Sequence, residues 1–529
     1  MHGYKLKESR KIKSVEFPAK LRWANQLKAP LYESLCRSKK GNNRVMLIIP
    51  PYNRFPDKEM KRASEPLGLL RIGSELVARG WNVKIIDAPC EGFDNEVSIN
   101  GGQVRFGLSF DELNKKIWDF DPAFVGISCL YTKQWRNARR LADIVKSVDP
   151  ERIVILGGSH PTGDYRNSLA DSPADYIVFG EGELTICELL DALYNKEDID
   201  KVRGIAYRTD SESDGIRVTK SRSFTEINSF VLNNRTLLNS RIYNRLMHTA
   251  GSRRSSKGDM AYVMTTKGCR QSCTFCLASL VQGGYREYSL RRVDGELMDL
   301  RRHGVNYIML EDDNLIHNMG RAIAIAQLLG SHKFRWVEEG GLALFKLLSE
   351  YKTGATKKLI RTFADNGCER IYLAVESANV RRLSESKKPD CNAKQRKEAF
   401  EIVERFAEKG ISVVGGFMLG FVHGSDHEKK EEIEETIQYA IEFMKRGMDF
   451  ANFFIVTPFP GTRDYSLQLP WIVRDYDYFS HEIPVMGGPE WTVEEMENIY
   501  AEARRKVNGD ELIDEILRTR NWVCRSDLK

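Results

Sequence analysis

The sequence has no apolar run long enough to cross a membrane: stretches such as Val45–Pro51 are far shorter than the roughly 20 residues that a spanning helix needs. The first residues, Met1–Lys20, are polar and basic and lack the apolar core of a signal peptide. Cysteine is also scarce, since 10 residues among 529 cannot form a disulfide scaffold. We therefore expect a soluble, cytoplasmic protein that makes no contact with a membrane.

A large excess of charge of one sign is missing too, because 80 Lys and Arg face 74 Asp and Glu, for a net charge of +6. The basic stretches Lys5–Lys13 and Arg253–Lys257 could grip RNA, which would make the protein a tRNA modifier. No RNA-binding module lies beside them, and charge runs are usually solvated, so the sequence argues against nucleic acid as a partner. With 42% apolar residues, the chain can form several globular domains.

Three of the cysteines, Cys269, Cys273 and Cys276, form a Cys-x3-Cys-x2-Cys motif directly after the short apolar segment Ala261–Met264. No other Cys or His follows before His303. A structural zinc ion is normally coordinated by four protein ligands. Three thiolates can instead hold an iron–sulfur cubane and leave one iron without a protein ligand. The motif therefore indicates a 4Fe-4S cluster whose open iron can bind a second molecule. A zinc knuckle or a chance group of buried thiols is the alternative.

Short apolar segments alternate with helical patterns from Arg44 onward. The expected strands are Val45–Ile49, Val83–Ile86, Phe124–Ser128, Ile153–Leu156 and Tyr176–Phe179, with helices such as Leu67–Arg79 and Trp135–Val148 between them. This order predicts a parallel, doubly wound, Rossmann-like α/β sheet, in which ligands bind beyond the carboxyl ends of the strands. Candidate binding residues at those ends are Ser128, Gly157, Gly158, His160, Gly180, Glu181, Gly182 and Glu183. Glycine lets the backbone approach a ligand closely, although ordinary turns need glycine as well.

A second series of strands and helices follows a polar stretch, Lys220–Gly258, that we interpret as a linker. Its expected strands are Ala261–Met264, Tyr307–Leu310, Phe334–Val337, Ile371–Val375, Ser412–Met418 and Phe450–Val456. These strands are too few to close a full barrel, so we expect a partial (βα)6 barrel with an open side. The expected domains are a basic arm (1–43), a Rossmann-like domain (44–200), a hairpin and linker (201–259), the partial barrel (260–470) and a helical extension (471–529).

Acidic residues stand at the ends of three successive barrel strands, which is where the chemistry of such barrels gathers. They are Glu311-Asp312-Asp313, Glu338-Glu339 and Glu376, which Ser377 follows. Carboxylates beside a cluster loop suit a ligand that bears an ammonium group and ribose hydroxyls, although loops are often charged in any case.

The cysteine motif, including Phe275 before its last cysteine, resembles the signature of the radical S-adenosylmethionine enzymes. The resemblance implies that the open iron binds the amino and carboxylate groups of S-adenosylmethionine. It also implies that an external one-electron reductant, such as a flavodoxin or ferredoxin, triggers the release of a 5′-deoxyadenosyl radical.

The same resemblance suggests roles for the residues at the strand ends. Asp312 or Asp313 would meet the methionyl amino group, and Glu376 with Ser377 the nucleoside or the carboxylate. Gly420 belongs to the strand that lines adenine in relatives. The residues after it depart from the Pro-Gly-Glu-Thr of many relatives, which puts adenine contacts there in question.

The order of a doubly wound domain, a linker and a cysteine-bearing barrel resembles the cobalamin-dependent branch of that family. The turns Gly157–Pro161 and Gly180–Glu183 resemble those by which the branch holds cobalamin. The resemblance therefore implies that cobalamin is a cofactor and that the first domain binds it.

The Asp-x-His-x-x-Gly motif of other cobalamin proteins is absent; the nearest pattern, at His317–Gly320, lacks the Asp and lies in the other domain. We therefore expect base-off cobalamin, with its own base displaced and no His ligand from that motif. His160 is either a lower ligand of cobalt or a turn residue. The loop after the first strand, which carries Arg54 and Arg62, should pass near the lower face of the corrin.

Within that branch, the resemblance is nearest to the C-methyltransferases of fosfomycin biosynthesis, which act on cytidylylated 2-hydroxyethylphosphonate. It rests on Arg105–Ser109, Glu311–Asn314, Ala374–Ser377 and Lys387–Pro389. It implies methylation of an unactivated sp3 carbon of a small molecule, with a nucleotidyl phosphonate as the candidate substrate. The alternatives are a cobalamin-dependent radical enzyme that cyclises or rearranges its substrate without methyl transfer, and a non-enzymatic cobalamin sensor.

Overall fold

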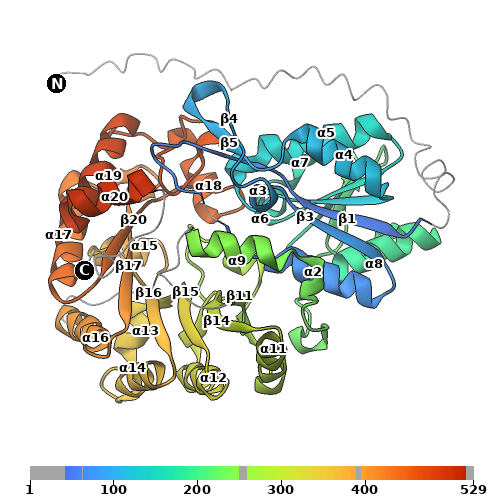
Figure 1. Cartoon of the computed structure of the whole chain (residues 1–529). Coiled ribbons are helices and arrows are strands. Elements are labelled where there is room, and N and C mark those ends of the chain that lie inside the picture. The colour runs from blue at the N-terminus through green and yellow to red at the C-terminus, as the bar shows by residue number, and fades with distance from the viewer. Residues whose placement is uncertain (1–41, 62, 250–258, 389–394, 520–529) are drawn as a thin grey trace, which may run out of the picture.

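The structure is a computed structural model that describes residues 42–61, 63–249, 259–388 and 395–519. Two α/β units lie side by side, the first on the right of Figure 1 in blue to teal and the second on the left in yellow to red. Almost all of the basic arm expected at the N-terminus lies outside the described residues, as do Arg62 and the basic stretch Arg253–Lys257.

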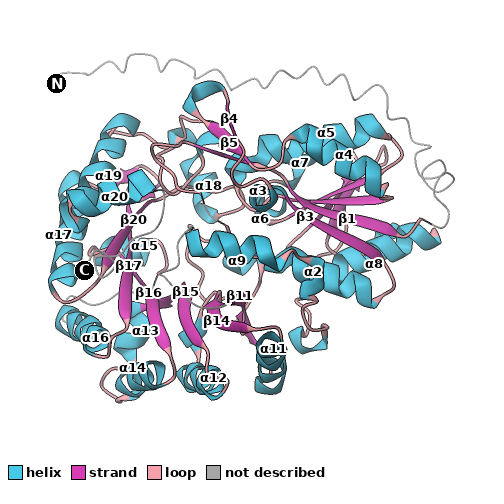
Figure 2. Cartoon of the chain, in the orientation of Figure 1, coloured by secondary structure: helices cyan, strands magenta, loops and turns pink. Residues whose placement is uncertain are grey.

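The first unit is built on a sheet whose central strands are parallel, in the order β3-β1-β6-β7-β8. These strands are β1 (Arg44–Ile49), β3 (Asn82–Asp87), β6 (Phe124–Ser128), β7 (Ile153–Gly157) and β8 (Tyr176–Val178). Helices cover both faces (Figure 2): α2 (Leu67–Ala78) and α8 (Gly182–Asn195) on one, α4 (Phe110–Phe120) and α5 (Trp135–Val148) on the other. Burial on both faces explains the continuous apolar runs of these strands. The expected doubly wound fold is confirmed.

The hairpin expected between the two domains belongs to this first sheet. Its strands β9 (Ile205–Arg208) and β10 (Ile216–Val218) pair with each other, and β9 runs antiparallel to β8 at the edge of the sheet. The boundary expected at residue 200 therefore falls inside the first unit. Spacing along the chain indicates a hairpin, but it does not show which sheet the hairpin joins.

The second unit is a curved sheet of parallel strands, in the order β11-β14-β15-β16-β17-β20. The strands are β11 (Asp259–Val263), β14 (Val305–Leu310), β15 (Arg335–Ala343), β16 (Cys368–Glu376), β17 (Ser412–Leu419) and β20 (Phe450–Ile455). Its outer helices are α11 (Leu290–Arg302), α12 (Met319–Ser331), α14 (Ala355–Asp365), α16 (Arg396–Glu408) and α17 (Lys430–Lys445). The main apolar core of the unit lies between these helices and the strands. The expected partial barrel is confirmed.

Two helices from outside the βα repeat fill the concave face of this sheet. In α9 (Ser240–Thr249), the side chains of Tyr243 and Leu246 are buried against β11 and β14. This helix lies within the stretch that we interpreted as a polar linker. In α20 (Asp510–Thr519), Leu512 and Ile513 are buried against β17 and β20, beside the preceding helix α19 (Val493–Asn508). The expected helical extension is confirmed for α19 and α20, whereas residues 472–492 form turns, isolated bridges and one short 3-10 helix (Tyr476–Tyr478).

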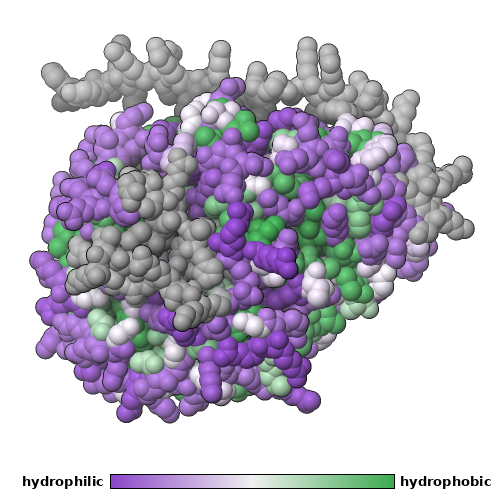
Figure 3. Space-filling model, in the orientation of Figure 1, coloured by the Kyte–Doolittle hydropathy of each residue, from purple (hydrophilic) through white to green (hydrophobic). Residues whose placement is uncertain are grey.

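Hydrophilic side chains cover most of the face in Figure 3, and apolar patches appear mainly over the first unit on the right. None of the helices in the described ranges is both long enough and apolar enough to cross a membrane.

A buried carboxyl closes the end of β17. One carboxyl oxygen of Glu428 accepts hydrogen bonds from the amide nitrogens of Gly420 (2.7 Å) and Phe421 (3.1 Å), and the residue is fully buried. The indole nitrogen of Trp491 donates to the Glu428 carbonyl oxygen at 2.9 Å. Burial raises the pKa of Glu428 to about 7, and the two amide donors oppose part of this rise. The carboxyl group thus binds the segment that replaces the Pro-Gly-Glu-Thr of many relatives.

We expect the Glu428→Gln variant to become more stable relative to the wild type as the pH rises. An unfolded chain loses the Glu428 proton near its ordinary pKa, below the folded value of about 7. The carboxyl therefore costs stability progressively as pH rises through this window, up to about 3 kcal/mol. The measurement is the difference in Tm between variant and wild type at about pH 5 and about pH 8. The exposed Glu431→Gln is the control, and an unchanged Tm difference for Glu428→Gln would contradict the assignment.

Candidate active site

The three cysteines lie on one loop whose ends are held together by a short antiparallel ladder. Strand β12 (Thr266–Lys267) pairs with β13 (Arg286–Glu287), and the loop runs between them. Cys269 and Cys273 are partly buried, and Cys276 is exposed. Desolvation raises the pKa of the Cys273 thiol to about 12, and the nearby ammonium of Lys388 opposes this rise. Within the described ranges, no three His, Cys, Asp or Glu side chains converge closely enough to hold a single metal ion.

Asp312 fixes the segment that leads into the cysteine loop. Its side chain is fully buried at the end of β14, and one carboxylate oxygen accepts from the amide nitrogens of Thr265 (2.9 Å) and Thr266. The hydroxyl groups of both threonines donate to the same carboxylate. Burial raises the pKa of Asp312 to about 6, although the hydrogen bonds from these donors lower it in part. The Asp312 carboxylate already accepts from the amides and hydroxyls of both threonines, whereas the Asp313 carboxylate accepts from one amide. Of the two candidates, Asp313 therefore has more capacity left to accept from a ligand's amino group.

Asp313 follows Asp312 in the chain and accepts a hydrogen bond from the first residue of the cysteine loop. One carboxylate oxygen accepts from the amide nitrogen of Gly268 at 2.7 Å. Gly268 has a φ of +75°, and a Cβ atom there would lie 2.4 Å from the carbonyl oxygen of Gly283. Glycine is therefore required where the two legs of the loop meet. The side-chain amide of Asn314 donates to the sulfur of Cys269, one of the predicted cluster ligands, at 3.5 Å, a contact that the sequence did not reveal.

Glu376 and Lys388 form an ion pair beside the cysteines, with 2.5 Å between carboxylate oxygen and ammonium nitrogen. Glu376 has a φ of +71°, which is strained for a residue with a side chain. Burial alone would lower the pKa of Lys388, but the charges of Glu376 and Cys273 hold it above its ordinary value. The sequence does not indicate this pairing of Lys388, because an exposed lysine and a mostly buried one look alike in a sequence.

The remaining candidates of the barrel are engaged within the protein. The Ser377 hydroxyl accepts from the amide nitrogen of Asn379 (3.0 Å) and lies 3.2 Å from the Thr436 hydroxyl. Phe275 packs against the main core of the barrel, and Gly420 donates its amide to Glu428. Their roles as S-adenosylmethionine contacts stay predictions.

The strand ends of the first unit lie against the second unit. Ser128 and Gly157 are opposed in the sheet. Gly158 has a φ of +109°, and a Cβ atom there would lie 2.5 Å from the Cys129 carbonyl oxygen, so glycine is required. Leu130 and Tyr131 follow β6 with 48% and 53% of their surfaces exposed. Exposed apolar side chains beside a glycine turn fit a large, flat ligand such as a corrin ring.

The side chains of His160 and Arg54 are enclosed by protein and are not exposed to such a ligand. The His160 ring is 1% exposed and lies between Trp135 and Tyr476, and burial lowers its pKa to about 3, so the ring is neutral. The Arg54 guanidinium is 2% exposed and donates to Glu96 at 2.8 Å and to the Glu59 carbonyl at 2.9 Å. Neither side chain is placed as an open ligand for cobalt.

The turn after β8 is placed differently from its sequence interpretation. Glu181 and Glu183 form ion pairs with Lys267, and Glu181 also binds Arg286. Both carboxylates therefore face the base of the cysteine loop in the second unit. Gly180 and Gly182, which flank Glu181, remain candidates for cofactor contact through their backbone.

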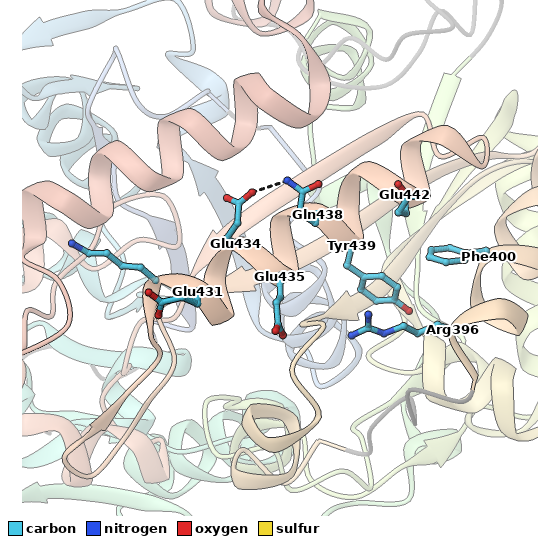
Figure 4. A pocket seen from close by; sticks show the side chains of 9 residues that line it. Arg396, Phe400, Glu431, Glu434, Glu435, Gln438, Tyr439 and Glu442 are labelled. Atoms are coloured by element: carbon cyan, nitrogen blue, oxygen red, sulfur yellow. Dashed lines mark hydrogen bonds between the residues drawn. The ribbon is translucent and has the colours of Figure 1, made fainter.

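A depression on the outside of the barrel lies apart from these strand ends, in the groove between α16 and α17 (Figure 4). It is lined by Arg396, Phe400, Lys430, Glu431, Glu434, Glu435, Gln438, Tyr439 and Glu442. The chemistry-bearing residues are elsewhere, at the carboxyl ends of the strands, so we do not assign the depression to the active site.

Comparisons with known proteins agree with this geometry. The chain matches the B12 binding domain family over residues 59–190 and the radical SAM superfamily over residues 263–440. It is 28% identical to the uncharacterized methyltransferase PH0819 of Pyrococcus horikoshii, over 87% of this chain and 91% of the relative. It is 27% identical to the cytidylyl-2-hydroxyethylphosphonate methyltransferase of Streptomyces wedmorensis, over 79% and 80%. The radical S-adenosylmethionine methyltransferase TsrM of Kitasatospora setae, solved with cobalamin and a 4Fe-4S cluster, shares the fold: the TM-score is 0.59 at 15% identity, over 80% of this chain and 77% of TsrM.

We expect Asp312→Ala to lower both the stability of the cysteine loop and its capacity for iron. The substitution leaves two buried amide donors without an acceptor, at about 1–3 kcal/mol each. The measurement is iron and sulfide per chain after anaerobic reconstitution, together with Tm. Asp365→Ala, an exposed residue at the end of α14, is the control. Wild-type iron content in Asp312→Ala would show that the loop does not depend on this carboxylate.

Proposed function

Since the chain joins a B12-binding domain to a radical S-adenosylmethionine domain and is a homologue of methyltransferases, we propose that it methylates an unactivated sp3 carbon of a small biosynthetic intermediate. One observation carries the proposal: the strand ends of the two units meet at the cysteine loop, where Glu181 and Glu183 bind Lys267. A substrate between the units would therefore lie within reach of both cofactor sites.

The cluster, S-adenosylmethionine and cobalamin supply one-electron chemistry and methyl carriage when bound, and the protein binds and orients them. Cys269, Cys273 and Cys276 hold the cluster. Asp313 accepts from the amino group of S-adenosylmethionine, and Lys388 pairs with its carboxylate. The carboxylates of Asp313 and Glu376 and the ammonium of Lys388 suit a ligand that carries both an amino group and a carboxylate.

Cobalamin binds base-off in the first unit, with no histidine ligand. This is supported by the absence of an Asp-x-His-x-x-Gly motif and by the enclosed ring of His160. The backbone of Gly157, Gly158, Gly180 and Gly182 lies at the carboxyl ends of β7 and β8, where ligands of doubly wound sheets bind. Ser128 lies at the end of β6, on the same edge.

The candidate substrate is a nucleotidyl phosphonate. The support is the likeness to the cytidylyl-2-hydroxyethylphosphonate methyltransferase, which extends over 79% of this chain. We further propose that an external one-electron carrier, such as a flavodoxin or ferredoxin, reduces the cluster, in a cytoplasmic setting that keeps the three thiols reduced.

The test is anaerobic reconstitution with iron, sulfide and cobalamin, followed by incubation with a nucleotidyl phosphonate, a one-electron reductant and S-adenosylmethionine whose methyl group carries deuterium. We expect a nucleotidyl phosphonate product that gains one labelled methyl group, together with 5′-deoxyadenosine. Cys273→Ala should abolish both. A product without mass gain, formed alongside 5′-deoxyadenosine, would instead establish cyclisation or rearrangement. Methylation by Cys273→Ala would refute the role of the cluster.

We expect Lys388→Met to bind S-adenosylmethionine at least about tenfold more weakly, which corresponds to about 1.4 kcal/mol. Without its ammonium, Glu376 and Asp313 repel the ligand's carboxylate, and Glu376 keeps an unpaired charge in a half-buried position. The measurement is the Kd of the reconstituted protein for S-adenosylmethionine. The neighbouring Lys387→Met is a matched control, because Lys387 is exposed. Equal Kd values for the two variants would contradict the assignment.

A further inference from the structure

Four charged side chains join the two units at the base of the cysteine loop. Lys267 and Arg286 occupy the two strands that close the loop, where they are cross-strand partners. The Lys267 ammonium lies 2.5 Å from a Glu183 carboxylate oxygen and 3.0 Å from one of Glu181. Both terminal nitrogens of Arg286 bind the Glu181 carboxylate, at 2.6 and 3.0 Å. We refer to Glu181, Glu183, Lys267 and Arg286 as the clamp.

The clamp is enclosed by protein. The side chains of Lys267, Glu181 and Glu183 are only 4%, 6% and 5% exposed. Buried ions are tolerated only with close partners, and removal of one partner leaves the other charge uncompensated. Burial alone would lower the pKa of Lys267, yet Glu183 raises it; Lys267 in turn holds the pKa of Glu183 below its ordinary value against burial. Each buried charge in the clamp therefore has an opposite charge within 3.0 Å.

The backbone of the turn after β8 also contacts the cysteine loop. A Cβ atom on Gly180 would lie 3.2 Å from the carbonyl oxygen of Val281, which belongs to the cysteine loop. The amide of Cys269, the first cysteine, donates to the Gly283 carbonyl at 3.2 Å. The turn that ends β8 thus rests directly on the return leg of the loop. A shift of this turn has to move the loop or break the ion pairs.

We propose that the clamp is a positioning device that couples the two cofactor sites, so that occupancy of the cobalamin site changes the affinity of the cysteine loop for S-adenosylmethionine. Glu181 and Glu183 act through Lys267 and Arg286 and make no contact with the corrin. The inference rests on the proposed function only in placing both cofactors at these strand ends. Coupling of this kind is reciprocal, so S-adenosylmethionine tightens cobalamin by the same factor.

The test uses the full-length chain with its reconstituted cluster and no substrate. The Kd for S-adenosylmethionine is measured with and without cobalamin, and the Kd for cobalamin with and without S-adenosylmethionine. For the wild type we expect both ratios to be about fivefold or more. For Lys267→Met and for the double variant Glu183→Gln/Lys267→Met, we expect ratios near one while both cofactors still bind. Lys267→Arg, which keeps the charge, should retain part of the coupling.

Lys146→Met is the matched control, because Lys146 forms an ion pair with Asp175 (2.8 Å) that is mostly buried and lies inside the first unit. Its ratios should equal those of the wild type even if its Tm falls. The proposal is overturned if the wild type shows no coupling or if the Lys267 variants keep it. It is also overturned if Glu183→Gln abolishes cobalamin binding while Lys267→Met does not, since the carboxylate would then contact the cofactor itself.

A second measurement needs no variant and covers the case in which the substituted chains do not fold. Hydrogen exchange of the wild type is followed over residues 268–286 with and without cobalamin. We expect cobalamin to slow exchange there, and unchanged exchange overturns the proposal. Neither measurement involves turnover, so a failure to methylate any substrate leaves both results standing. Conversely, absence of coupling between the two cofactor sites would not change the result of the labelled-methyl experiment, which tests the proposed function alone.

Discussion

The base of the cysteine loop is the point on which the arrangement of this protein depends. Asp312 holds its first leg from within the barrel, through bonds to Thr265 and Thr266. Glu181 and Glu183 hold both legs from the first unit, through Lys267 and Arg286. Every one of these carboxylates is buried, and buried charges are stable only where their partners are fixed. The loop therefore has one well-defined position between two domains, which is what a site shared by two cofactors requires.

Much of the fold follows from local patterns in the sequence. Strand β6 and helix α5 have the bounds that the apolar periodicity predicts, because each is a short element whose burial is visible within its own residues. The cysteine motif is likewise local, and the family comparison supports its interpretation. The helix α9 was missed although its sequence has an amphipathic pattern, in which Ile242, Tyr243 and Leu246 pack on one face, because the stretch around it is polar.

The site was less predictable than the fold, since its side chains depend on contacts between distant segments. The sequence places Glu181 and Glu183 at a strand end, but it does not show that they face a lysine more than eighty residues away. The sequence likewise left Asp312 and Asp313 as equal candidates. Only the structure shows that the Asp312 carboxylate accepts hydrogen bonds from Thr265 and Thr266. Lys388 belongs to a segment that carries the resemblance, but the sequence does not show its ion pair with Glu376, a residue with a positive φ at the end of β16. Local spacing identifies elements and motifs, whereas ion pairs across domains require the tertiary structure.

The position of α20 has a consequence for how the protein is made. Leu512, Ile513 and Ile516 of this helix are buried against Val414 and Phe450 on the inner face of the barrel sheet. Because synthesis proceeds from the N-terminus, the first unit can fold on the ribosome well before these residues emerge. The inner face of the barrel sheet at β17 and β20 is covered only after α20 itself has been synthesised. The apolar strip formed by Val414 and Phe450 is therefore uncovered in any chain that has folded its strands but has not yet docked α20.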